Sequence, residues 1–364
     1  MRMKHRLRGG QPEQRSALRL LPVLLGVLLT LSLLVIAIPQ AQMALTALGM
    51  RLPGALTRSL ARPTPPRPSP VSSTDGLPLN TLNRQMVAAF YRERYLASGE
   101  VDSDWNGSHA ACDAGSTSPA FRDAILQRVN YFRAMAGVPA DIQFLDELNA
   151  RAQQVALMIS ANGKLSHTPD SSWSCYSADG AWAAESCNLH LGVYSISAVD
   201  SYMEDRGNSN YLLAHRRWLL NTRTRWMGTG DVPAVGGYPD ANALWVVGPT
   251  SGDRPKTRDP YVAWPPPGYV PYQVVFPRWS VTFDGADFSQ ASVTMTHHDH
   301  IVPVTVLAAG NGPGESTLAW EPHIPPKERP AVDTWYTVQV SNMLAEGGFS
   351  NHFQYTVVIF DPDA

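Results

Sequence analysis

Apolar residues recur at helical spacing through the middle of the chain. Apolar positions repeat there every three or four residues, the period of an amphipathic helix with one buried face. The longest such segment opens with Ser118 and Pro119, a cap followed by a first-turn proline, and stops at Gly137. The predicted helices cover 81–97, 118–137, 146–163, 197–207 and 212–220.

A period of two replaces the helical period further along the chain. Two short strands, 226–230 and 243–247, follow the helices, so helices laid over a small sheet are expected in an α+β domain at 81–250. A proline-rich linker is expected at 251–275, and a small all-β sandwich of the immunoglobulin-like kind at 276–364. The strands predicted for it are 280–283, 291–296, 302–306, 317–320, 334–340 and 353–360.

The first 80 residues have the pattern of a segment that crosses a membrane. Residues 1–19 are basic and would stay in the cytoplasm, and 20–42 contain an uncharged aliphatic run about long enough to span a bilayer. This run is longer than the core of a typical cleaved signal and no convincing small-x-small site follows, which favours an uncleaved transmembrane anchor over a removed signal peptide. Residues 43–80 are proline-rich and predict an extended stalk.

Composition fits an exported protein and excludes one class of partner. The 364 residues are enough for two ordinary domains, and a charged fraction of only 16% with ten Trp and thirty Pro is typical of exported β-containing proteins. A formal net charge of -2 with scattered basic residues gives no reason to expect nucleic-acid binding.

Three cysteines allow at most one intramolecular disulfide. All three pairings among Cys112, Cys175 and Cys187 are open, and Cys112–Cys175 is favoured because it would pin the segment before the first core helix to the loop after His167. Cys187 is interpreted as structural rather than as a nucleophile or soft metal ligand, because nothing beside it indicates an activated thiolate.

Candidate chemistry is concentrated between residues 162 and 220. His167, Glu185, Asp205 and His215 supply nitrogen and oxygen donors that one divalent cation such as Zn²⁺ can share. The metal hypothesis uses the two histidines with Glu185 as third ligand and water in the open position. The alternative is a hydrogen-bonded His and acid cluster without metal.

Other polar and aromatic groups favour structural interpretations. The run 297–300, His-His-Asp-His, is predicted as a surface turn between two strands rather than a metal site. Trp264, Trp279, Trp320 and Trp335 are expected in the sandwich core rather than at a glycan or protein contact. No Gly-x-Ser-x-Gly, His-Glu-x-x-His, phosphate-binding loop or dinucleotide fingerprint supports a familiar enzyme class.

The surroundings of these residues resemble those of a known family. The matching segments are VNYFRAMAGVP (129–139), AQQVALM (152–158), LSH (165–167) and HRRWLLN (215–221), in this order. They are similar to the CAP superfamily of cysteine-rich secretory, antigen 5 and pathogenesis-related proteins, in its bacterial branch of extracellular SCP-like proteins. The resemblance covers roughly 118–250 and implies a three-layer α-β-α sandwich.

The resemblance also implies a central cleft lined by His167, Glu185, Asp205 and His215. Two departures from the family pattern stand in this sequence. Where the family reads Gly-Glu-Asn-Leu, two extra residues separate Glu185 from Asn-Leu in AESCNL (184–189). Where it reads Trp with Glu three residues later, Tyr202 and Asp205 stand, which leaves Glu204 as a competing acid.

The leading hypothesis is a membrane-tethered extracellular CAP protein with one membrane pass. Its cleft would bind a divalent cation and a lipid, peptide or glycan, without catalysis, and the sandwich would be a spacer or adhesion module. The alternatives are a metal-dependent hydrolase with Glu185 as general base, and a purely structural cell-surface protein. Secretion after cleavage is the alternative localisation.

Overall fold

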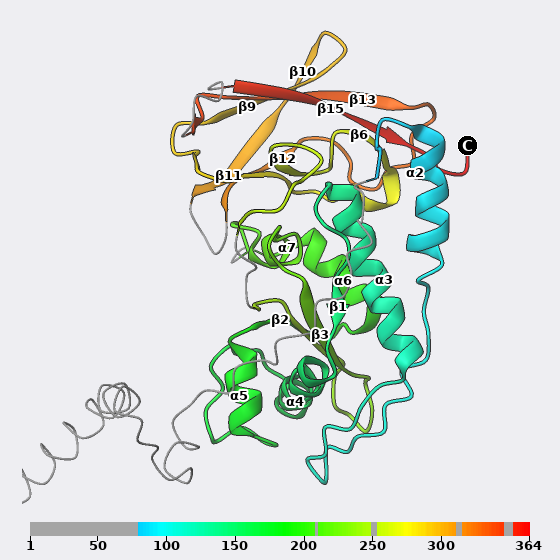
Figure 1. Cartoon of the computed structure of the whole chain (residues 1–364), viewed down its shortest axis with the longest axis vertical. Helices are drawn as coiled ribbons and strands as arrows, with labels where there is room; N and C mark the ends of the chain where they lie inside the picture. The colour runs from blue at the N-terminus through cyan, green and yellow to red at the C-terminus, as the bar shows by residue number, and fades with distance from the viewer. Residues whose placement is uncertain (1–78, 208–209, 249–252, 311–314, 346–351) are drawn as a thin grey trace, which may run out of the picture. The chain divides into compact units, whose positions relative to one another are not determined.

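The long helices begin and end at the residues that the caps predict. Figure 1 shows the computed structural model, which describes residues 79–364 except 208–209, 249–252, 311–314 and 346–351. In α3 (Pro119–Ala136) the Ser118 side chain accepts a hydrogen bond from the Phe121 amide, and Gly137 closes the helix at φ 77°. Helix α4 (Asp146–Asn162) ends likewise at Gly163, with φ 58°. These caps satisfy backbone groups that a helix end leaves unpaired.

The remaining helices are shorter. The predicted helix at 81–97 is α2 (Arg84–Phe90) continued by a π-helical stretch, η2 (Tyr91–Leu96). Helix α6 (Ser195–Glu204) starts two residues before the predicted Ser197, and α7 (Ala214–Leu219) lies within the predicted 212–220. Helix α5 (Ala178–Ala184) was not predicted, because its seven residues show no sustained apolar stripe.

A four-stranded sheet lies between the helices, in the order β1-β3-β4-β2. Strand β1 (Gln143–Phe144) is parallel to β3 (Trp226–Val232), and β3, β4 (Ala241–Trp245) and β2 (Cys187–Leu191) are antiparallel. The predicted strands near 226 and 243 are confirmed as β3 and β4. The other two were missed, since two or five residues between helices give little periodic signal.

Helices cover both faces of this sheet. Ala243 and Trp245 of β4 pack with α4 and α5, whereas Leu244 packs with α3 and α6. Helix α4 lies so close to β3 that a Cβ at Gly228 or Gly230 would meet the α4 backbone at Leu148 or Ala152. Alternate β3 and β4 side chains therefore face different helix layers, as the pleat of a strand requires. An α+β fold is confirmed, and Figure 1 shows α4 and α5 beside β2 and β3.

Two larger sheets form the C-terminal part, where the strand predictions hold. One has five strands in the order β10-β9-β13-β15-β6 and the other four in the order β11-β12-β7-β5. Their inner faces share a core that includes Trp264, Trp279 and Trp320, all fully buried. Trp335 departs from the expectation and is 43% exposed. The strands new here are β7 (Trp279–Phe283), β9 (Ser292–His297), β10 (His300–Val302), β11 (Val304–Gly310), β12 (Ser316–Pro322), β13 (Thr334–Ser341) and β15 (His352–Phe360).

The expected linker at 251–275 needs a correction. Its second half forms β5 (Val262–Trp264), which pairs with β7, and β6 (Gly268–Pro271), which runs parallel to β15. Each strand therefore belongs to one of the two sheets. The prolines misled the prediction because they are tolerated at strand ends and on sheet edges, where no amide is needed.

The hairpin around His298 confirms the surface-turn interpretation of 297–300. His297 ends β9, His300 begins β10 opposite it, and His298 and Asp299 form the exposed turn between them. His298 has a left-handed backbone, with φ 50°. The run is therefore explained by a tight turn.

The three N-terminal predictions are a basic segment at 1–19, a membrane span at 20–42 and a stalk at 43–80, and all but residues 79–80 lie outside the described residues. Within residues 79–364, apart from the gaps, no helix is long and apolar enough to cross a membrane.

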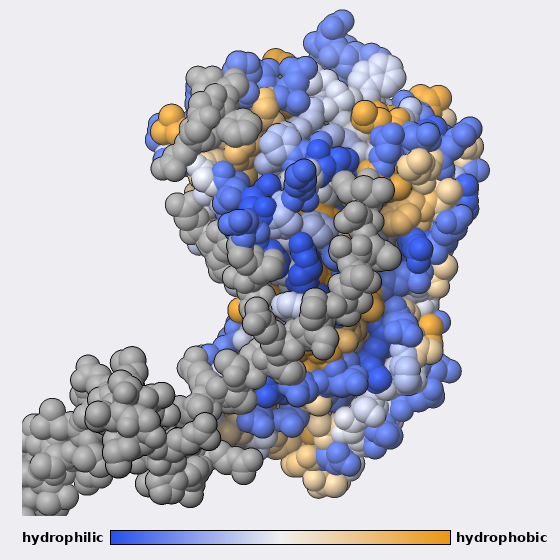
Figure 2. Space-filling view, in the orientation of Figure 1, coloured by the Kyte–Doolittle hydropathy of each residue, from blue (hydrophilic) through white to orange (hydrophobic). Residues whose placement is uncertain are grey.

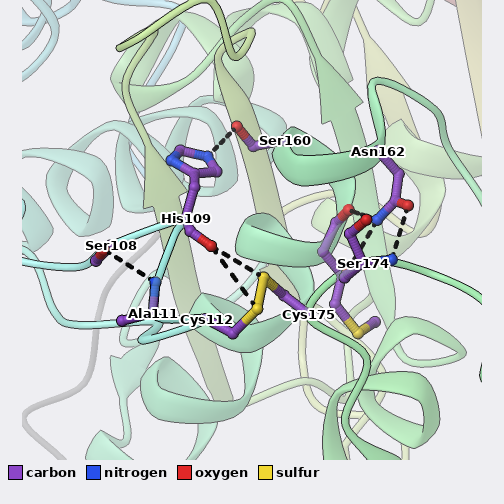
Figure 3. The surroundings of a disulfide bond; sticks show 9 residues. Ser108, His109, Ala111, Cys112, Ser160, Asn162, Ser174 and Cys175 are labelled. Carbon is purple, nitrogen blue, oxygen red and sulfur yellow. Dashed lines mark hydrogen bonds between the residues drawn. A yellow bond between two sulfur atoms is a disulfide. The ribbon is translucent and has the colours of Figure 1, made fainter.

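The favoured disulfide is confirmed. Cys112 and Cys175 are joined, which ties the segment before α3 to the loop after α4 (Figure 3). Asn162 and Ser174 exchange two hydrogen bonds of 3.0 Å that close the same loop at the end of α4. Cys187 is a free, fully buried thiol whose pKa is raised by burial, which agrees with a structural role. The loop that carries His167 is thus fixed at both ends.

Candidate functional site at the ends of helices α6 and α7

A buried carboxylate and a half-buried imidazole form the centre of the site. Asp205 is 1% exposed, and its Oδ1 lies 2.8 Å from Nδ1 of His215 in α7. Its Oδ2 accepts a hydrogen bond from the Arg216 amide at 3.2 Å. Both carboxylate oxygens are therefore used to orient the first turn of α7. In this arrangement Nδ1 of His215 is the donor and Nε2 is left as the acceptor nitrogen.

Asp205 occupies an unusual backbone position. It is the C-cap of α6 in the left-handed region, with φ 54°, where Gly or Asn is usual. The turn rotates its side chain back toward α7. The prediction that Asp205 lies in the last turn of a helix is therefore off by one position, and its side chain faces the site instead of solvent.

Arg278 of the β-sandwich donates hydrogen bonds to the backbone of the turn at Asp205. Nη1 of Arg278, just before β7, lies 2.7 Å from the carbonyl oxygen of Asp205 and 3.1 Å from that of Gly207. It also lies 3.2 Å from the Asn210 carbonyl. Nε of Arg278 is paired with Glu321 at 3.1 Å. Arg278 thus caps the carbonyl end of α6 with positive charge, a favourable position relative to the helix dipole.

Tyr202 and Asn188 form the inner wall beside His215. The Tyr202 ring centre lies 5.3 Å from that of His215, and its hydroxyl lies 2.7 Å from Oδ1 of Asn242 and 3.1 Å from the Asn188 carbonyl oxygen. The Asn188 side chain donates to the His215 carbonyl oxygen at 3.1 Å. Tyr202 stands where the family reads Trp, and burial raises its pKa well above the usual value, so the phenol stays neutral.

The wall continues to a second buried acid, Asp231 in β3. It is fully buried and accepts hydrogen bonds from the Ser195 amide, the Asn242 side chain and the Thr229 hydroxyl, at 2.8, 2.8 and 2.7 Å. These donors are neutral, and burial raises its pKa despite them. The sequence reasoning missed this residue, although a lone Asp between apolar strand positions was a usable signal.

His167 and Glu185 form a second pair, which is joined through the backbone of α5. Nδ1 of His167 is 2.8 Å from the carbonyl oxygen of Ala184, the residue before Glu185. Glu185 is the C-cap of α5, and both side chains are exposed. The extra residues after Glu185 are accommodated in β2. The Ser186 carbonyl accepts amides from Val246 and Val247, and the buried Cys187 begins the strand.

Glu204 is directed elsewhere. Its carboxylate pairs with Arg206 at 2.6 Å and with Lys327 at 3.8 Å. Its backbone carbonyl lies 3.4 Å from Nη2 of Arg216. Asp205, rather than the competing Glu204, is therefore the acid that contacts His215.

The structure joins the predicted residues in two pairs. Asp205 contacts His215 directly, and His167 contacts the backbone next to Glu185, while Asn188 links the strand after Glu185 to α7. Among the described residues, no group of three or more His, Cys, Asp or Glu side chains is placed to hold a metal ion. The expected three-ligand arrangement of His167, Glu185 and His215 is therefore not formed as a preset metal site.

Comparison with known proteins identifies the domain that carries these pairs. No curated protein matches the chain as a relative. The model of the family described as "Cysteine-rich secretory protein family" (CAP) matches residues 126–247, which include all four predicted site residues. Residues 126–247 are therefore a CAP domain of the cysteine-rich secretory protein family.

Proposed function

We propose that the protein is an exported, membrane-tethered CAP protein whose His and acid surface binds a polar polymer, a peptide or a glycan. The tether is the apolar segment at 20–42. Export is supported by the Cys112–Cys175 disulfide, because such bonds persist in oxidising compartments. Figure 2 shows that hydrophilic residues cover much of the described part of the drawn face, with hydrophobic patches between them.

The observation that carries the proposal is the contact between Asp205 and His215. A buried carboxylate that fixes Nδ1 leaves the imidazole in one tautomer with Nε2 as an oriented acceptor. His215 remains 23% exposed, so this acceptor group is open to a ligand. Exposed Glu185 and His167 add further hydrogen-bonding groups. Pre-organised polar groups of this kind favour a ligand rich in hydroxyl or amide groups.

The test is binding to peptide and glycan arrays by the full chain in detergent. The double variant His167→Ala with His215→Ala should bind the captured ligands about tenfold more weakly or worse, since each lost hydrogen bond removes about 1 kcal/mol or more. His300→Ala, at the exposed start of β10, is the matched control and should bind like the wild type. Equal capture of the same ligands by wild type and double variant would falsify the proposal.

Cleavage of the tether has a separate test. N-terminal sequencing of the mature protein should find the original terminus or one near it. A new terminus shortly after residue 40 would replace the tethered protein by a secreted one.

A divalent cation such as Zn²⁺ is a second candidate ligand. The same Asp205–His215 contact favours it, because a histidine ligand commonly donates its other ring N–H to a carboxylate. His215 would be the fixed donor, with His167 and Glu185 as the other candidates. Titration calorimetry with Zn²⁺ should then show binding that His215→Ala removes, and an unchanged affinity in that variant would exclude this site.

A further inference from the structure

A buried guanidinium lacks a carboxylate partner where α7 meets the β-sandwich. Arg217 is only 8% exposed, and its Nη2 donates to the carbonyl oxygen of Glu315 at 2.7 Å. Within the described part of the chain, its Nε and Nη1 are buried and have no hydrogen-bond partner. Arginine carries five N–H donors, and a buried charge without a partner is strongly unfavourable. The site as described is therefore electrostatically incomplete.

The carboxylates around Arg217 are occupied by other arginines. Oε1 of Glu315 lies 2.8 Å from Nε of Arg254 and 3.9 Å from Nη1 of Arg223, and it accepts the Thr222 hydroxyl at 3.0 Å. Asp284 is half-exposed and lies 3.6 Å from Nη2 of Arg223. Glu315 and Asp284 thus pair with Arg254 and Arg223. Among the described residues, neither acid is left to compensate the charge of Arg217.

Arg216 adds a second positive charge but is also held elsewhere. It is fully buried, with Nε donating to the Met203 carbonyl at 2.6 Å and Nη1 to the Ser280 hydroxyl at 3.1 Å. Its nearest acid is Asp205, which bonds its amide. Burial lowers the pKa of Arg217, and it lowers that of Arg216 to about 10. Both groups still carry their charge near neutral pH, where an anion would offset the loss of water.

A cavity of about 40 Å³ lies beside these groups. One water molecule needs roughly 10–15 Å³ of such space, so a few atoms of water size fit. Both domains contribute to the wall, and hydroxyl groups supplement the positive charges. The lining includes Arg216, Arg217, Arg223, Ser280, Thr282 and Glu315.

We propose that this cavity binds a small oxyanion, a phosphate or carboxylate group, attracted by the uncompensated charge of Arg217 and held by the guanidinium and hydroxyl groups that line the cavity. Guanidinium groups match such anions because their donors lie in one plane and can bind two oxygens together. The anion would join α7 of the CAP domain to β7 of the sandwich. His215 does not line this cavity, and the proposal does not depend on the proposed ligand surface.

The test is calorimetric titration of the full chain with inorganic phosphate and, in a second arm, with acetate, at constant ionic strength. Saturable one-to-one binding of at least one of the two anions is expected. The stronger binder identifies the group as phosphate or carboxylate. Arg217→Gln should weaken this binding about tenfold or more, and Arg217→Lys less, because lysine keeps the charge without the planar donors. Arg329→Gln, whose side chain is 65% exposed, should bind like the wild type.

Two outcomes overturn the proposal: no saturable binding of either anion by the wild type, or equal affinity in Arg217→Gln. If circular dichroism shows that Arg217→Gln is unfolded, anion binding is measured with Arg223→Gln instead. Arg223 lies at the rim with its side chain 29% exposed, so its replacement should be tolerated. Binding by Arg223→Gln should be several-fold weaker, and an unchanged affinity would exclude the site.

Discussion

Two buried carboxylates of the CAP domain differ in the groups that contact them. Asp205 contacts the imidazole of His215 and the backbone amide of Arg216. Asp231 accepts hydrogen bonds from an amide, a carboxamide and a hydroxyl. A carboxylate stabilised by neutral donors remains costly to ionise in the interior. Burial therefore raises the pKa of Asp231.

Asp231→Asn should change how stability depends on pH. The pKa of Asp231 in the folded protein lies above the ordinary 3.8. In the window from 3.8 upward, the folded state binds more protons than the unfolded state, so wild-type stability contributed by this group falls as pH rises. Asparagine does not titrate. The free energy of unfolding of the variant, relative to wild type, should therefore increase between about pH 4 and about pH 7.

Urea unfolding at several pH values measures this difference. Asp299→Asn is the control, because Asp299 lies in the exposed turn between β9 and β10. A difference between Asp231→Asn and wild type that stays constant with pH would contradict the expected behaviour.

Some residues of the site could be predicted from the sequence and others could not. Asp205 and His215 were named, and they are in contact, but their pairing depends on a left-handed residue that no periodicity reveals. Tyr202 and Asn188 were noted only as departures from a family pattern or as part of it. Arg278 had no signal at all, because it lies 73 residues from Asp205 in sequence. Such contacts follow from tertiary packing rather than from local pattern.

At the scale of elements, the contact of α4 with β3 shows how closely two layers approach. Gly228 and Gly230 have no side chain on the face covered by α4, and the helix backbone occupies the space that a side chain would need. The side chains of Thr229 and Asp231 lie on the other face, where the Asp231 carboxylate accepts hydrogen bonds from the Thr229 hydroxyl, the Asn242 side chain and the Ser195 amide. The glycines thus set the distance between helix and sheet.

Gly230→Ala should destabilise the domain by about 3 kcal/mol, because α4 or β3 must move to admit the methyl group. The free energy of unfolding by urea measures the effect. Gly310→Ala in β11 is the matched control, since a Cβ there meets no atom within 4 Å and should leave stability nearly unchanged. Equal stabilities for the two variants would mean that the layers move apart at little energetic cost.

Elements were predictable where local rules agreed with the tertiary structure. The caps at Ser118, Gly137 and Gly163 placed α3 and α4, and alternation placed β7, β12 and β13. The elements missed were α5, β1, β2, β5 and β6. They are short, or they contain prolines at sheet edges, and their partners are distant in sequence. Pairing with those partners, not intrinsic propensity, makes them strands.

At the scale of the molecule, the sandwich supports the CAP domain. The described residues from 79 onward belong to one compact unit. Arg278 and Ser280 bond to the α6 end and to Arg216, while Phe132 of α3 packs on Trp264 with ring centres 5.2 Å apart. The expectation of a spacer or adhesion module did not include this role, because domain contacts leave no mark in the periodicity of either domain.

Arg278→Ala should lower the free energy of unfolding by about 3 kcal/mol, since a charged donor to buried carbonyls is lost. Because the turn at Asp205 loses its support, the fixed tautomer of His215 should become a mixture, which nitrogen NMR of the imidazole detects. Arg94→Ala, which replaces an exposed arginine far from this turn in sequence, should change neither quantity. A stability loss with an unchanged His215 signal would show that Arg278 supports the fold without positioning the site.

The contacts of α2 have a consequence for the order of folding. Arg84 bonds to Asp333, 249 residues later, and also to the carbonyl oxygens of Asp361 and Ala364. Strand β6 has β15 as its neighbour in the sheet. The first described helix and the edge of one sheet therefore acquire these partners only after residues 333–364 have been synthesised. Contacts between such distant residues slow folding, so these surfaces stay open to aggregation in the growing chain.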